Sequence, residues 1–147
     1  MAERQAHARP FARQYYELVS ARSELIEGAF AAHARGELKP LVDVLNPGVV
    51  WLGVEGRGEN GATACCENRS HVVARLTQLY ERGRRFRVVD QAEHEASVAV
   101  GLELADPDWD VTVTVWKLFR FDSEGETIVQ IQDCVGREEA IAALLPA

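Results

Sequence analysis

The periodicity of the apolar residues changes near the middle of this chain, and that change limits the possible folds more than any other feature. From Phe11 to about Arg35, apolar side chains recur at spacings of three and four residues, as on one face of a helix. After Phe86 they alternate with polar residues in four separate runs, as in half-buried strands. Helices in the first half and strands in the second predict an α+β domain.

Short turns join the predicted strands, so consecutive strands should pair as antiparallel hairpins. The two clearest turn segments are 105–109 and 122–125, which combine Asp with Pro or Gly. We treat residues 1–10 as a flexible N-terminus and residues 11–147 as a single domain. The predicted elements are, in chain order, helices 11–35 and 38–45, strand 49–52, a helix from about 67 to 82, strands 86–90, 97–104, 110–121 and 127–135, and helix 137–145.

The charge balance limits the classes of partner. The 147 residues include 16 Lys and Arg against 23 Asp and Glu, which is a net charge of −7. A net acidic chain is a poor match for nucleic acid or an anionic membrane, and no apolar run reaches the roughly 20 residues of a membrane span. The N-terminal stretch also lacks the apolar core of a signal peptide, so we expect a cytoplasmic protein.

Neither the cysteines nor a glycine motif indicates a metal or a cofactor. Cys65 and Cys66 are adjacent and Cys134 is far along the chain, so we expect three reduced thiols and no metal site. Residues 56–61 match the spacing G-x-G-x-x-G, but the predicted helix begins too late for a dinucleotide-binding turn. We predict a loop there that could cover a pocket, and no cofactor.

Pairing Phe121 with Glu126, and Leu104 with Asp110, across the two turns predicts the strand register. A one-residue slip would turn a strand over, so the whole assignment of faces depends on these two pairs. We expect the helices to cover the face that both hairpins then share, which is mostly apolar. It carries Val98, Val100, Leu102, Thr112, Thr114, Trp116, Leu118, Val129, Ile131 and Asp133.

Asp133 is the residue of this face that most needs an explanation, because an unpaired carboxylate among apolar side chains is costly. One interpretation is a catalytic group, since burial can tune a carboxyl group for general acid or base chemistry. The other is a structural aspartate that accepts hydrogen bonds from Thr114, an indole N–H or the backbone. On either interpretation we expect Trp51, Thr114, Trp116 and Asp133 to line one internal pocket.

Three stretches of the chain are similar to proteins of one superfamily. They are residues 45–51 (LNPGVVW), 66–72 (CENRSHV) and 128–140 (IVQIQDCVGREEA), the last being a strand, an Asp and then a helix that begins Arg-Glu-Glu-Ala. Together with the order of elements, they resemble the nuclear-transport-factor-2-like superfamily over about residues 20–145. Its relatives include ketosteroid isomerases, SnoaL-like polyketide cyclases and limonene epoxide hydrolases.

The resemblance implies a cone, in which N-terminal helices pack on a strongly curved antiparallel sheet around a deep, mostly apolar internal pocket. It also often implies a homodimer through the outer face of the sheet. On the predicted register that outer face carries Val111, Val113, Val115, Phe119 and Ile128, which are apolar enough to need cover.

Candidate catalytic residues follow from the same resemblance. Isomerases of this fold use a Tyr on the first helix, for which Tyr15 or Tyr16 could stand, together with two pocket acids, of which the predicted face offers only Asp133. SnoaL-like cyclases use a pocket acid, often with a His nearby, and here His71 or His33 could take that place. The Arg-x-Asp pair of the epoxide hydrolases has no counterpart in the predicted middle strands.

We therefore expect a protein that binds a small hydrophobic molecule in an internal pocket. An alternative is an isomerase or polyketide-cyclase-like enzyme that uses Asp133 as general acid or base. A second alternative is a non-enzymatic protein-interaction module, which predicts a pocket too filled to admit a ligand. The candidate ligand-binding residues are Trp51, Thr114, Trp116, Tyr16 and His71.

Overall fold

A computed structural model of the chain describes residues 10–54 and 63–145, with side chains for residues 21–54 and 64–145. All of the predicted elements are present with boundaries that agree within a few residues, and one further strand, β2, was not predicted. The elements are α2 (Pro10–Ala34), α3 (Lys39–Asp43), β1 (Leu45–Gly53), β2 (Thr63–Cys66), α4 (Arg69–Glu81), β3 (Arg85–His94), β4 (Ser97–Ala105), β5 (Val113–Phe121), β6 (Ile128–Cys134) and α5 (Arg137–Leu144).

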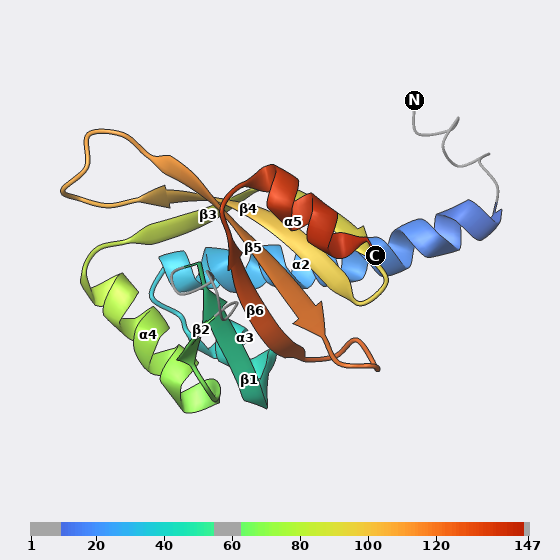
Figure 1. The fold of residues 1–147 in the computed structure, drawn as a ribbon, viewed down its shortest axis with the longest axis horizontal. Helices are drawn as coiled ribbons and strands as arrows, with labels where there is room; N and C mark the ends of the chain where they lie inside the picture. The colour runs from blue at the N-terminus through green and yellow to red at the C-terminus, as the bar shows by residue number, and fades with distance from the viewer. Residues whose placement is uncertain (1–9, 55–62, 146–147) are drawn as a thin grey trace.

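The strands form one sheet in the order β2-β1-β6-β5-β4-β3 (Figure 1). The consecutive pairs β3–β4, β4–β5 and β5–β6 are antiparallel, as predicted, and β1 also pairs antiparallel with β2. β1 and β6 pair in parallel, so the sheet is mixed. Turn lengths could not predict this pairing, because the two strands are far apart in the sequence.

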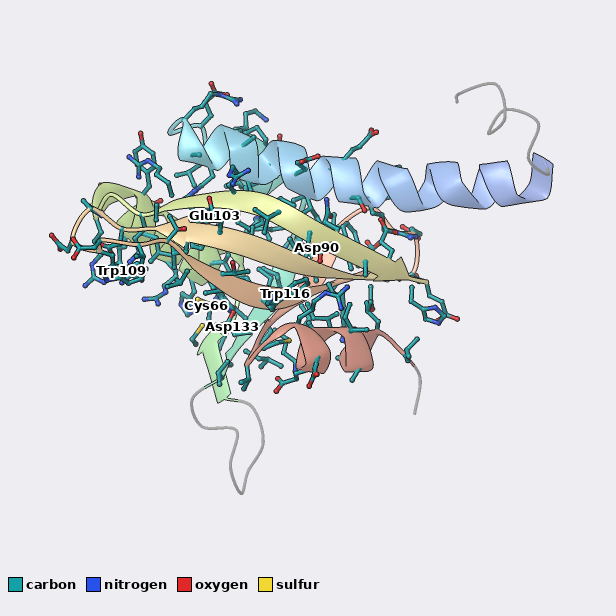
Figure 2. All side chains as sticks on the ribbon, turned by 90° about the horizontal axis from the view of Figure 1, so that it is seen from above. Cys66, Asp90, Glu103, Trp109, Trp116 and Asp133 are labelled. Carbon is teal, nitrogen blue, oxygen red and sulfur yellow. The ribbon has the colours of Figure 1, made fainter. Side chains whose placement is uncertain are left out.

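Helices cover both faces of the sheet (Figure 2). The long helix α2 crosses one face, which we call the inner face, and α4 packs against β1 in the same apolar core. The short helix α5 lies on the opposite, outer face. This arrangement confirms the predicted α+β architecture, with the helices of the first half packed on a sheet built mainly by the second half.

The main core lies between the inner face and the helices α2, α3 and α4. The ring of Phe30 in α2 packs against the rings of Phe86 and Phe119, with centroids 5.8 and 5.9 Å apart. One turn later in α2, His33 is fully buried, and its Nε2 lies 3.0 Å from the carbonyl oxygen of Leu76 in α4. His33 therefore joins the two helices that cover the inner face.

The observed strand register differs from the predicted one by three residues in both hairpins. Trp116 pairs with Cys134 and Lys117 with Asp133, whereas the prediction paired Trp116 with Ile131. In the neighbouring hairpin Gly101 pairs with Trp116. Because side chains alternate along a strand, an odd slip moves every β5 side chain to the other face. The predicted common face of Trp116 and Asp133 is therefore wrong.

Side-chain hydrogen bonds in the loop between β5 and β6 explain the slip of that hairpin. The carboxylate of Asp122 accepts the backbone N–H of Glu126 at 2.9 Å and the hydroxyl of Thr127 at 2.8 Å. The chain thus makes a loop where the prediction had a tight turn, and Phe121 pairs with Ile128. In the other connection, β5 begins at Val113 rather than Asp110.

The predicted composition of the outer face needs the same correction. Phe119 and Ile128 are each 1% exposed in the inner core, and Val115 packs against that core. The outer face instead carries a small cluster beneath α5. This cluster consists of Ala99, Trp116, Leu118, Cys134, Ala140 and Leu144. The homodimer surface inferred from the resemblance therefore does not have the residues that were assigned to it.

Candidate functional site

A lysine, an aspartate and a tryptophan meet on the inner face. The Nζ of Lys117 lies 2.5 Å from the Oδ1 of Asp133, and the indole N–H of Trp51 donates to the same oxygen at 2.9 Å. The Lys117 ammonium also lies 4.6 Å from the centre of the Trp51 ring, within the range of a cation–π contact. We call these three residues the Lys–Asp–Trp cluster.

The register places all three side chains together. Lys117 and Asp133 are direct partners in the β5–β6 ladder, so their side chains stand side by side. Trp51 is the partner of Ile131 in the parallel β1–β6 ladder, two residues from Asp133 on the same face. The parallel pairing of β1 with β6 is therefore what brings the indole to the carboxylate.

The cluster is only partly shielded from solvent. The side chain of Lys117 is 10% exposed and that of Asp133 is 27% exposed. An ammonium group buried to this extent would be strongly destabilising without its carboxylate partner. Its exposure leaves Asp133 in contact with the space in front of the sheet, where a ligand could reach it.

Cys66 lies beside this cluster, because β2 pairs it with Trp51. Burial raises the pKa of the Cys66 thiol to about 12, and the neighbouring Cys65 and Asp133 act in the same direction. Cys66 is therefore a neutral thiol at physiological pH and a poor nucleophile. Cys65, Cys66 and Cys134 are all free cysteines, and Cys134 faces α5, on the side of the sheet opposite Asp133.

The centre of the cone is filled by side chains. The space enclosed by Phe30, Phe86, Phe119 and their neighbours has a volume of only about 10 Å³. That is about the volume that a single water molecule occupies. Between these described residues, the deep apolar pocket implied by the resemblance is therefore closed.

A larger cavity, which we call the mouth cavity, opens next to the Lys–Asp–Trp cluster and has a volume of about 200 Å³. Its walls are mainly apolar, and its charged groups come from α4, the segment after α4, β5 and β6. This space is large enough for a small ligand, and Asp133 is part of its wall. The lining residues are Trp51, Val54, Arg75, Leu79, Arg84, Phe86, Leu104, Val115, Trp116, Lys117, Asp133 and Cys134.

The candidate residues on the strands have different positions. Trp51 and Asp133 are brought together, as expected. Thr114 is exposed and pairs with Glu103, away from the mouth cavity. Trp116 borders the mouth cavity, but its ring packs in the α5 cluster, where the Arg137 guanidinium lies 5.7 Å from the ring centre. The expectation that Thr114 and Trp116 share the inner face with Asp133 is wrong.

The candidate residues on the helices do not converge on Asp133. His71 is exposed at the start of α4, where its backbone N–H donates to the Asn68 side chain at 3.0 Å. His33 is in the core between α2 and α4. The side chains of Tyr15 and Tyr16 lie outside the described residues, as does the glycine-containing loop 56–61.

Lys117 is the residue that the sequence analysis missed. A signal for it exists, because Lys117 stands in strict alternation with Val113, Val115, Phe119 and Phe121. That alternation marks these five residues as one face of β5. The predicted turns placed these residues on the outer face of the sheet, so Lys117 was not predicted to lie near Asp133.

A second polar cluster, which we call the Glu93 cluster, lies between α2 and β3. The hydroxyl of Ser23 donates to the Oε1 of Glu93 at 2.6 Å, and the Nη1 of Arg22 lies 3.6 Å from Oε2. The Glu93 side chain is only 1% exposed, and burial raises the pKa of its carboxyl group despite the opposing effects of Ser23 and Arg22. None of these residues lines the mouth cavity.

In the part of the chain that the structure describes, His, Cys, Asp and Glu side chains do not gather in any group of three or more that could hold a metal ion. None of the described helices combines the length and the apolar character needed to cross a membrane.

No family model and no curated protein matches this sequence. Solved structures do match its fold, at low sequence identity. An LEH-like epoxide hydrolase from M. tuberculosis is 15% identical with a TM-score of 0.62, covering 86% of this chain and 90% of that one. TerC co-crystallised with polyporic acid is 16% identical with a TM-score of 0.60, covering 84% and 96%.

A nuclear transport factor 2-like protein of unknown function from Burkholderia pseudomallei is 15% identical with a TM-score of 0.60, covering 85% of this chain and 98% of that one. This chain has the nuclear transport factor 2-like fold. The fold inferred from the resemblance is thereby confirmed. At these identities the likeness extends to the fold and not to the chemistry, because this fold carries many unrelated functions.

Proposed function

We propose that this nuclear transport factor 2-like protein binds a small, largely apolar molecule in the mouth cavity. The observation that carries the proposal is a cavity with mainly apolar walls and a few convergent polar groups, at whose centre is the Lys–Asp–Trp cluster. Small-molecule sites in proteins have this composition, in which apolar area supplies affinity and a few polar groups orient the ligand.

The volume of the mouth cavity limits the size of the ligand. A buried cavity of about 150 Å³ is large enough for benzene, whereas sites for drug-sized molecules occupy at least about 300 Å³. At about 200 Å³, the mouth cavity suits a molecule with a single ring and a small substituent. A larger ligand would need part of the molecule to remain outside.

Two of the solved structures with this fold support a small-molecule role by analogy. One is described as an epoxide hydrolase, and another was crystallised with polyporic acid. Both statements concern those proteins. For this chain, they add weight to a ligand in a cavity on the inner side of the sheet.

The proton-transfer alternative has less support. The Oδ1 of Asp133 already accepts an ammonium group and an indole N–H, so both of its lone pairs are engaged. A carboxylate held in this way is better suited to fix Lys117 and Trp51 than to remove a proton from a ligand. The protein-interaction alternative fits the filled centre of the cone, but it offers no explanation for the mouth cavity.

The test is an NMR titration that uses toluene and phenol as probes. The indole N–H signal of Trp51, assigned with Trp51→Phe, should shift as either probe enters the cavity. Val115→Phe places a larger side chain in the cavity wall and should abolish the shift. Val89→Phe adds the same bulk at a residue that is 43% exposed and does not line the cavity, so it should leave the shift unchanged.

Circular dichroism of both variants would show that they are folded. The proposal would be overturned if neither probe moved the Trp51 signal at saturation of the aqueous phase. It would also be overturned if folded Val115→Phe bound both probes as tightly as the parent protein.

A further inference from the structure

The charges around the mouth cavity have the opposite sign to the chain as a whole. The protein has a net charge of −7, yet the cavity is lined by three cationic side chains, Arg75, Arg84 and Lys117, and by one carboxylate, Asp133. A local excess of positive charge on an acidic protein favours anions at that place and disfavours cations.

Two of the three cations are already compensated. Lys117 is paired with Asp133 at 2.5 Å. The Nε of Arg84 lies 2.8 Å from the Oδ2 of Asp106, whose side chain is only 10% exposed. The backbone N–H of Asp108 and the Arg84 side chain hold the pKa of Asp106 below its usual value, so this carboxylate is ionised when it pairs with Arg84.

Arg75 is the cation that remains. It lies on α4 at the edge of the cavity. None of the ion pairs between residues of the described ranges 10–54 and 63–145 includes Arg75. Its positive charge reaches Cys66, beside the Lys–Asp–Trp cluster, where it lowers the pKa of the thiol against the dominant effect of burial. Among the described residues, the mouth cavity therefore has one positive charge at its rim without a carboxylate partner, and mainly apolar walls behind it.

We infer that the mouth cavity selects small cyclic or aromatic monocarboxylates, with the ring against the apolar walls and the carboxylate on the Arg75 guanidinium. This inference rests on the proposed function and names the class of its ligand. A guanidinium group matches a carboxylate in shape and charge through two parallel N–H···O bonds. A second negative charge would have no cation left, since Lys117 and Arg84 are paired.

The experiment compares benzoate with benzamide, which has nearly the same shape and no charge. NMR titrations of the Trp51 indole signal give both affinities, for the parent protein and for Arg75→Gln. Arg82→Gln is the matched control. Arg82 is at the C-terminal end of the same helix, α4, is exposed and does not line the cavity.

We expect the parent protein to bind benzoate about tenfold more tightly than benzamide, which corresponds to one charge-assisted contact at a partly exposed site. Arg75→Gln should remove this preference and leave benzamide binding unchanged. Arg82→Gln should retain it. The preference should also weaken at high salt, because Arg75 is at the surface.

Two results would overturn the inference while leaving the proposed function in place. One is equal or tighter binding of benzamide by the parent protein. The other is an equal loss of benzoate affinity in Arg75→Gln and Arg82→Gln. That result would indicate a long-range electrostatic effect of the positive charges and no specific contact with Arg75. If benzoate, benzamide, toluene and phenol all failed to bind, the proposed function would fail together with the inference.

Discussion

Asp133 and Glu93 are two carboxylates withdrawn from solvent, and their surroundings differ. Asp133 has an ammonium group in direct contact and an indole N–H on the same oxygen. Glu93 is more completely buried, yet its guanidinium neighbour, Arg22, lies 3.6 Å away and offsets the effect of burial only in part. Its Oε2 has no hydrogen-bond partner within the described structure.

The difference shows why burial alone does not identify a functional carboxylate. Asp133 is the better compensated of the two, and it is also the one that borders a cavity. Glu93 has its pKa raised by burial, a property expected of a catalytic acid, but it lies away from that cavity. Access to a ligand, rather than a perturbed pKa, favours Asp133 as part of the site.

The largest effect is expected from removing the cation of the Lys–Asp–Trp cluster. Lys117→Met should lower the free energy of unfolding by about 3 kcal/mol, because it leaves Asp133 without its partner. This is the lower end of the range for broken buried ion pairs, since Asp133 keeps some contact with solvent. Urea denaturation at pH 7 measures the change.

Lys39→Met is the control for that substitution. The Nζ of Lys39 lies 2.8 Å from the Oδ2 of Asp43, so Lys39 also forms a close ion pair, but its side chain is 83% exposed. Its loss should change the free energy of unfolding by less than about 0.5 kcal/mol. If Lys117→Met were as mild as Lys39→Met, the contrast between Asp133 and Glu93 would lose its basis.

A smaller effect is expected from neutralising the carboxylate itself. Asp133→Asn keeps the shape of the side chain but weakens its bonds to Lys117 and Trp51, and should lower the free energy of unfolding by about 2 kcal/mol. The double variant Lys117→Met/Asp133→Asn should be more stable than the sum of the two single losses predicts, because no unpaired charge remains.

The single variant Asp133→Asn also tests the catalytic alternative for Asp133. If this variant were as stable in urea as the parent protein but had lost a measured activity, Asp133 would be a catalytic residue. That result would contradict the positioning role argued above.

The smallest effect concerns pH and the Glu93 cluster. Because the pKa of Glu93 is higher in the folded protein than its ordinary value of 4.5, the folded protein holds this proton more tightly than the unfolded chain does. Stability contributed by Glu93 is therefore lost as the pH rises from about that ordinary value through the raised pKa. Glu93→Gln should remove this decline.

Urea midpoints of the parent protein and Glu93→Gln between pH 4 and pH 8 measure the difference. The variant should gain relative stability as the pH rises. Glu24→Gln, a change at an exposed residue of the same α2–β3 region, should follow the parent protein. A relative loss of stability in Glu93→Gln at high pH would mean that Arg22 compensates Glu93 as fully as Lys117 compensates Asp133.

Part of the candidate site could be predicted from the sequence. Asp133 stands out because it alternates with Val129 and Ile131 in an apolar run, and a carboxylate in such a place needs partners. An indole N–H was one of the partners considered, and Trp51 supplies it. Lys117 could not be reached from the expected turns, because the three-residue slip turned β5 over.

The sequence by itself determined the type and order of the elements, because hydrophobic periodicity and turn residues act over a few neighbouring positions. Only the tertiary structure decided which strand faces meet. Asp122 bonds into its own loop and shifts β5 against β6, while β6 pairs in parallel with the distant β1. The mouth cavity forms where these pairings between distant segments bring Trp51, Lys117 and Asp133 together. Local sequence patterns carry no information about such contacts.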